Sequence, residues 1–180
     1  MIELNKVYHF KIENLFHPDC PKGIVKNLSK KICEDGRTSS PVITTYVHEQ
    51  WFPELTYVDK KFIDFIGKII EGVDGESNVE KKMFTLSGGS KFCPSNMVGK
   101  GRTIDPVKSR QICEENKLIY LLADATEFPN VYVTFVDGIE LHDRHKSCSI
   151  GYNNKWRNFY FGRNVVSWRL FEWYEEIGGR

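Results

Sequence analysis

The chain has 180 residues, of which 41% are hydrophobic and 27% charged, and its 25 Lys and Arg nearly balance 24 Asp and Glu. The net charge of +1 excludes a strongly basic coating protein, and no apolar run approaches the roughly 20 residues of a membrane-spanning helix. The N-terminus alternates apolar and polar residues, unlike a signal peptide, and the five cysteines are widely spaced without a CxxC pair. We therefore expect a cytoplasmic protein with free thiols, folded as a single domain over residues 1–180.

Strands and helices are predicted to alternate through the first third of the chain. The alternation in VYHFKI (7–12) predicts a strand, and the apolar spacing over residues 21–36 predicts a helix that ends at Gly36. The β-branched and aromatic residues of SPVITTYV (40–47) predict a second strand. Residues 59–71 carry their Phe and Ile residues on one broad helical face, which predicts a second helix.

A buried strand is predicted near the middle of the chain. VEKKMFTL (79–86) is typical of a strand, and an Asp-Pro pair at the start of residues 105–115 predicts a helix there. The uninterrupted apolar run LIYLLADA (118–125) predicts a strand that is buried on both faces of a sheet. We expect it to be an inner strand, flanked by helices 59–71 and 105–115.

The remaining elements complete an α/β or α+β fold. NVYVTFV and IELH, on either side of Asp137-Gly138, predict a β-hairpin. A strand is expected over residues 155–161 and an amphipathic helix over residues 165–177. Because helices and strands interleave, we predict a mixed central β-sheet flanked by helices.

The stretch from Asp74 to Lys82 carries the residue types of a metal-dependent hydrolase. Glu80 and Lys82 are two apart on a predicted strand, so their side chains share a face, and Asp74 on the preceding turn can add a second carboxylate. Two carboxylates bind Mg²⁺ through hard oxygen ligands, and an ammonium orients the attacking water or stabilises the growing charge. Asp74, Glu80 and Lys82 are thus candidate catalytic residues, with Asp74 and Glu80 as Mg²⁺ ligands. The alternative is a cross-strand charge pair on a solvated strand face.

The pattern Asp-xn-Glu-x-Lys at the start of a strand resembles the PD-(D/E)xK nucleases, particularly type II restriction endonucleases. The core of that family is a helix, a catalytic β-meander, a second helix and a further buried strand, and residues 55–140 offer predicted elements in a similar order. The resemblance implies a restriction-endonuclease-like core and site-specific, Mg²⁺-dependent cleavage of double-stranded DNA. It also implies a homodimer, because a two-fold axis matches a palindromic site.

Two features depart from that family pattern. No proline precedes Asp74, and the predicted helix 59–71 leaves little room for a first strand of the meander. Two rival acidic sets exist, which are Glu54, Asp59 and Lys61, and Asp137, Glu140 and His142. We rank both lower, because Asp59 resembles a helix cap and the second set lacks a lysine and begins at a predicted hairpin turn.

Cationic side chains gather just after the proposed catalytic strand and again between residues 141 and 169, where aromatic residues are interleaved. Such stretches supply contacts to nucleic-acid phosphates, although a solvated strand face in front of core aromatics gives the same pattern. The candidate nucleic-acid-binding residues are Lys91, Lys100, Arg102, Lys108, Arg110, Arg144, Lys146, Lys155 and Arg157. Those from Arg102 onward are expected on one face with the active site.

Histidine spacing leaves a zinc site open. His142, His145 and Cys148 are separated by two residues each, as are His17 and Cys20, and these spacings suit zinc ligation. Structural zinc sites usually show tighter paired knuckles, and HDRHKSC reads more simply as a polar loop.

Two other functional classes compete with the restriction-like nuclease. A ββα-metal nuclease would use His142 or His145 with Asn153 or Asn154, but helix 165–177 starts too far along the chain for that compact motif. A non-catalytic domain that binds nucleic acid or a small molecule would use the same basic and aromatic stretches without cleavage.

Overall fold

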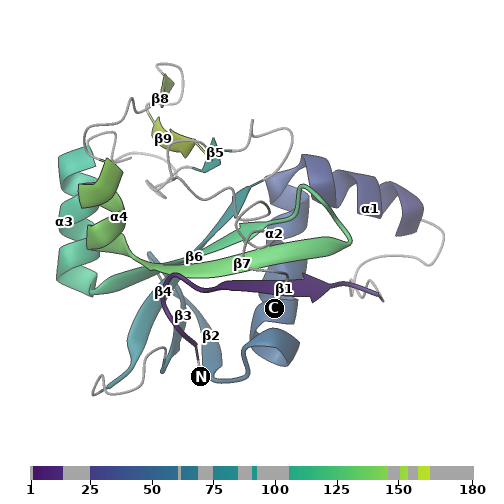
Figure 1. The fold of residues 1–180 in the computed structure, drawn as a ribbon, viewed down its shortest axis with the longest axis horizontal. Helices are drawn as coiled ribbons and strands as arrows, with labels where there is room; N and C mark the ends of the chain where they lie inside the picture. Colours follow the sequence, from purple (N-terminus) through teal and green to yellow (C-terminus); the bar gives the residue numbers. More distant parts are fainter. Residues whose placement is uncertain are drawn as a thin grey trace.

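Six strands form one mixed β-sheet in the computed structural model (Figure 1). Across the sheet they are β1 (Val7–Lys11), β7 (Asn130–Asp137), β6 (Leu118–Asp124), β4 (Ser77–Phe84), β3 (Ile63–Gly67) and β2 (Leu55–Lys60). β4 and β6 run parallel, whereas the other neighbouring strands are antiparallel. The predicted mixed central sheet is confirmed, and the fold is α+β. The structure describes residues 2–13, 25–60, 62–68, 75–84, 91–92, 106–145, 151–153 and 158–162.

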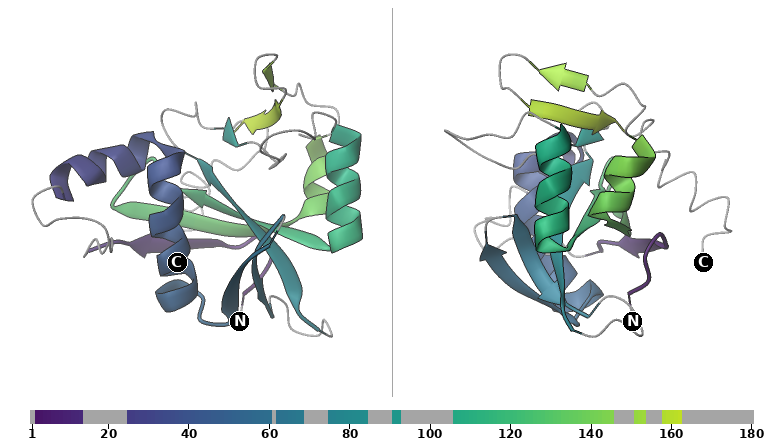
Figure 2. Two further views of the ribbon diagram at one scale, coloured as in Figure 1. Left: turned by 180° about the vertical axis from the view of Figure 1, so that it is seen from behind. Right: turned by 90° about the vertical axis from the view of Figure 1, so that its left-hand side faces the viewer.

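Helices flank this sheet in two pairs, which stand at opposite ends of the view in Figure 1 and are seen from two further sides in Figure 2. The pairs are α1 (Val25–Glu34) with α2 (Gly36–Tyr46), and α3 (Pro106–Asn116) with α4 (Gly138–His145). Successive residues of β6 alternate between two cores, because Leu121 belongs to the cluster that includes α1 and α2 and Leu122 to the cluster that includes α3 and α4. Every residue of β6 is buried, so its predicted position as an inner strand is confirmed.

Three short strands form a second, smaller sheet (Figure 1). Its strands are β5 (Lys91–Phe92), β9 (Asn158–Gly162) and β8 (Gly151–Asn153). β9 confirms the described part of the strand predicted over residues 155–161, whereas the predicted helix 165–177 lies outside the described residues. Within the described part of the chain, no helix is long and apolar enough to cross a membrane.

The strand predicted over residues 40–47 is wrong, because this segment lies in α2 and the π-helical turn Val47–Trp51 that follows it. Its β-branched residues favour a strand in isolation. However, Val42, Ile43 and Tyr46 repeat at helical spacing and are buried in the core against the sheet. Burial of this face outweighs the small difference in intrinsic propensity.

The junction between α1 and α2 corrects the expected role of Gly36. Helix α1 is confirmed, but Gly36 begins the next helix rather than only closing the first. The reason is Asp35, whose Oδ1 accepts a hydrogen bond from the backbone N–H of Arg37 at 3.0 Å and so caps the start of α2.

The helix predicted over residues 59–71 is also wrong, because its described part contains the end of β2 and all of β3, which form an antiparallel hairpin. The apolar residues are nearly continuous because both faces of β3 are covered. Phe65 belongs to the core with α1 and α2, and Ile63 packs against the core with α3 and α4. Gly67 lies so close to β2 that a Cβ there would be 2.4 Å from the carbonyl oxygen of Glu54. The helix that covers β6 on the side of Phe65 is therefore α2, in place of the predicted helix 59–71.

The hairpin predicted around Asp137-Gly138 is wrong as well, because β7 runs directly into α4. Asp137 Oδ1 accepts a hydrogen bond from the backbone N–H of Glu140 at 2.8 Å, which caps the helix. Gly138 lacks the positive φ that an Asp-Gly hairpin turn needs. It is required instead for packing, since a Cβ would lie 2.7 Å from the carbonyl oxygen of Leu118.

Candidate functional site

Glu80 and Lys82 form an ion pair on β4, with Lys82 Nζ 2.8 Å from Glu80 Oε1. In the parallel register Glu80 lies beside Tyr120 and Lys82 beside Leu122, both in the core with α3 and α4. The expected projection of both side chains from one face is confirmed. The solvated strand face is wrong, because the Lys82 and Glu80 side chains are only 7% and 3% exposed. In this conformation neither side chain is accessible to a DNA phosphate.

Buried polar groups continue from Glu80 toward helix α3. The Cys113 thiol donates a hydrogen bond to the Tyr120 hydroxyl at 3.4 Å. Burial raises the pKa of Cys113 to about 11 and the pKa of Tyr120 well above its ordinary value, and the negative charge of Glu80 acts in the same direction on both. Both groups are therefore neutral near pH 7, and Cys113 is not an activated nucleophile.

Lys81 extends from β4 toward helix α2 instead. Its Nζ donates hydrogen bonds to the Ser40 carbonyl oxygen at 2.5 Å, to Ser40 Oγ at 2.8 Å and to Thr44 Oγ1. Burial lowers the pKa of Lys81 to about 8, and the negative charges of Asp64 and Glu80 partly oppose this effect. The ammonium has three acceptors for its three N–H groups, so Lys81 ties the sheet to α2.

Asp64 on β3 is a carboxylate beside this strand that the sequence pattern did not indicate. Its Oδ2 accepts a hydrogen bond from the backbone N–H of Lys81 at 2.7 Å, so the carboxylate lies directly against β4. The last registered pair is Phe65 with Val79, and Asp64 therefore occupies the next position, across from Glu80. Asp64 is only partly buried, in contrast to Glu80.

Asp64 was missed because residues 59–71 were predicted as a helix. Had the segment been interpreted as a strand antiparallel to β4, Asp64 would have been the first acid considered. Asp74, the acid chosen from the sequence, lies outside the described residues. Asp64 on β3 and Glu80 on β4 belong to neighbouring strands, and their hard oxygen atoms are the donor type that Mg²⁺ prefers. Among the described side chains, no group of three or more His, Cys, Asp or Glu residues is placed so that it could hold a metal ion.

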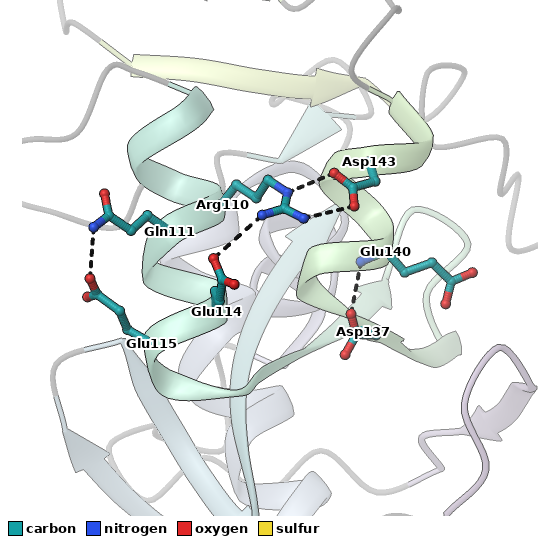
Figure 3. A network of polar contacts seen from close by, with 7 residues as sticks. All are labelled: Arg110, Gln111, Glu114, Glu115, Asp137, Glu140 and Asp143. Carbon is teal, nitrogen blue, oxygen red and sulfur yellow. Dashed lines mark hydrogen bonds and ion pairs between the residues drawn. The ribbon is translucent and has the colours of Figure 1, made fainter.

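Arg110 is the best-defined residue of the predicted nucleic-acid-binding set, and it is already paired (Figure 3). Its Nε and Nη2 donate to Asp143 Oδ1 and Oδ2 at 2.7 and 3.0 Å, and its Nη1 lies 3.6 Å from Glu114 Oε2. The guanidinium thus bridges α3 and α4. Lys108 is exposed on α3. Lys91 lies in β5 and Arg144 in α4 with side chains that are not described, and Lys100, Arg102, Lys146, Lys155 and Arg157 lie outside the described residues.

His142, common to the zinc, ββα-metal and rival acidic sets, is buried between α3 and α4. Its Nε2 lies 3.2 Å from Ser109 Oγ, and burial together with the positive charge of Arg110 lowers the pKa of His142 to about 4. The other proposed zinc ligands and Asn154 fall outside the described residues or side chains, as does the side chain of Asn153.

The two rival acidic sets also have structural explanations. Asp59 lies in strand β2 with φ 45° and not at the start of a helix, and Lys61 is outside the described residues. Asp137 caps α4.

Comparison with protein-family models, with curated proteins and with solved structures gave no significant match.

Proposed function

We propose that this chain is a Mg²⁺-dependent endonuclease that cleaves double-stranded DNA at a specific site, in the manner of type II restriction endonucleases. The order of elements around β4 carries the proposal: helix α2 precedes the β2–β3–β4 meander, and helix α3 and the parallel strand β6 follow it. This is the order that the resemblance to PD-(D/E)xK nucleases implies. The β2–β3 hairpin supplies the first strand of the meander, for which the predicted helix left little room.

Each candidate residue has a distinct role in this proposal. Glu80 is one oxygen ligand of Mg²⁺, and the second is Asp64, across from it on β3, or Asp74. When bound, Mg²⁺ supplies a Lewis acid and a more acidic water for phosphodiester hydrolysis. Lys82, which lies beside Glu80, contributes a positive charge next to the reacting phosphate. We propose a homodimer, because two related sites match the two strands of a palindromic duplex. We also propose that the protein is cytoplasmic.

The burial of Glu80 and Lys82 favours a second candidate, a non-catalytic nucleic-acid-binding domain. If the pair only fills the interior of the sheet, the protein binds DNA through its exposed cations and leaves it intact. Catalysis, in contrast, requires that the residues covering Glu80 move aside when substrate binds.

A plasmid and phage DNA assay separates these candidates. With Mg²⁺, the wild-type protein is expected to give discrete fragments that disappear in EDTA. Glu80→Gln is expected to lose cleavage by at least about 100-fold, the scale of removing one group that stabilises transition-state charge. Glu115→Gln, which changes an exposed acid on α3, is the matched control and is expected to cleave normally. Circular dichroism of each variant verifies folding.

Asp64→Asn and Asp74→Asn, compared in the same assay, identify the second metal ligand, since only the ligand's variant is expected to lose cleavage. Full cleavage by folded Glu80→Gln would show that the assignment of Glu80 is wrong. Gel retardation without cleavage by the wild-type protein would support the non-catalytic domain, and neither binding nor cleavage would contradict both candidates.

A further inference from the structure

We propose that the ammonium group of Lys82 occupies the cation position at Glu80 and that a divalent metal ion must displace it to bind there. This inference rests on the proposed function, because it takes Glu80 as a metal ligand. It goes beyond that function by assigning Lys82 a second role, which is to keep the site closed until a metal ion enters.

The first argument is the burial of the Glu80 carboxylate. A buried negative charge needs a nearby positive charge or a strong set of donors, and Lys82 Nζ at 2.8 Å supplies the positive charge here. The interior at Glu80 is therefore built for a cation, and that cation belongs to the chain itself.

The second argument is the repulsion between two cations at one carboxylate. A metal ion bound to Glu80 at the usual distance of about 2.1 Å would lie within a few ångströms of the present Lys82 ammonium. Charges of the same sign repel strongly at that distance in a medium of low dielectric constant. Lys82 must then leave Glu80, and this frees its positive charge for a phosphate.

The third argument is that the Lys81 ammonium does not occupy a cation position at a carboxylate. Its three hydrogen-bond acceptors are a carbonyl and two hydroxyl oxygens of α2, which are dipoles rather than full charges. A divalent ion at Glu80 leaves these acceptors in place. Lys81 is thus the natural control, one residue away and with the same charge.

Mn²⁺ binding to the full chain, measured by electron paramagnetic resonance without DNA, tests the exchange. Lys82→Met is expected to raise the Mn²⁺ affinity at least about tenfold, because the competing charge is gone. Lys82→Gln, which keeps a hydrogen-bond donor for Glu80, is expected to do the same. Lys81→Met is expected to change the affinity by less than about twofold, and Glu80→Gln in the Lys82→Met background is expected to abolish the gain.

A readout in the unaltered protein complements these variants. Mg²⁺ is expected to speed the acetylation of Lys82 by acetic anhydride, followed by mass spectrometry, and to leave Lys81 protected. An unchanged rate at Lys82, or an equal gain in affinity from both lysine variants, would contradict the exchange. If the wild-type protein cleaves DNA and Lys82→Met binds Mn²⁺ no more tightly, only this inference fails. If no form binds Mn²⁺ and none cleaves DNA, the proposed function fails with it.

Discussion

The two faces of strand β4 treat neighbouring lysines differently. Lys81 reaches toward α2, where a carbonyl and two hydroxyl oxygens accept its hydrogen bonds. Lys82 extends to the side of α3 and α4, where Glu80 provides a full negative charge. The neutral oxygen acceptors of α2 hold the Lys81 ammonium by hydrogen bonds alone. The Glu80 carboxylate carries a full charge, and it can bind a metal ion in place of the Lys82 ammonium. Two adjacent residues of one type are therefore suited to different tasks by what lies opposite each of them.

The largest expected effect comes from breaking the charge pair on one side only. Glu80→Leu is expected to lower the free energy of unfolding by about 3–5 kcal/mol, because it leaves the Lys82 ammonium buried without its counter-charge. The double variant Glu80→Leu with Lys82→Leu is expected to recover most of this loss, since two apolar side chains replace the pair. Urea unfolding of the three proteins measures both values. A loss below about 1 kcal/mol in the single variant would mean that Lys82 readily finds another partner.

A smaller effect is expected at Lys81 in alkaline solution. Its pKa is about 8 in the folded protein against an ordinary 10.5, so the unfolded chain holds this proton longer between those values. Stability is therefore expected to rise between pH 8 and 10.5, by about 3 kcal/mol for this group alone. Urea unfolding at both pH values, compared with Lys81→Met, isolates the contribution. Identical pH profiles for the two proteins would show that Lys81 is not the group responsible.

An effect of similar size is expected in acid at His142, on the side of the sheet with α3 and α4. His142 has a pKa of about 4 in the folded protein against an ordinary 6.5, so protonation favours the unfolded chain as the pH falls through this window. A loss of about 3 kcal/mol is expected between pH 6.5 and 4, because the pKa of His142 is shifted as far as that of Lys81. His142→Gln is expected to flatten this part of the profile, as measured by chemical unfolding. The free energy of unfolding is thus expected to change in alkali through the side with α2 and in acid through the side with α3 and α4. An unchanged acid response in His142→Gln would contradict the assignment to His142.

Local patterns predicted some elements correctly and exchanged others. Strand β6 was predicted because a strand covered on both faces is almost entirely apolar, and α3 was predicted because an Asp-Pro pair marks a helix start. Residues 40–47 were predicted as a strand and are helical, whereas residues 59–71 were predicted as a helix and contain strands. Propensity and apolar spacing do not reveal which faces of a segment will be covered. The helix before the meander was consequently sought about twenty residues too late in the chain.

The candidate site was also predictable only in part. Glu80 and Lys82 could be paired from the sequence because side chains two apart on a strand share a face, and β4 is a strand. Asp64 could not, since its place across from Glu80 depends on the pairing of β3 with β4, and β3 lies in the segment that was predicted as a helix. A capping Asp137 was similarly mistaken for a hairpin turn, because Asp-Gly serves both purposes.

Strand β1 closes one edge of the central sheet by pairing with β7, and Val7 there lies beside Thr134. During synthesis on the ribosome, β1 leaves the exit tunnel long before its partner strand exists. Its backbone groups must then remain hydrated or be paired elsewhere until β7 has emerged. Helix α2 and the β2–β3–β4 meander precede β7 in the sequence, so they are available for packing earlier. β1 can therefore join the sheet only after β7, the strand with which it pairs, has been translated.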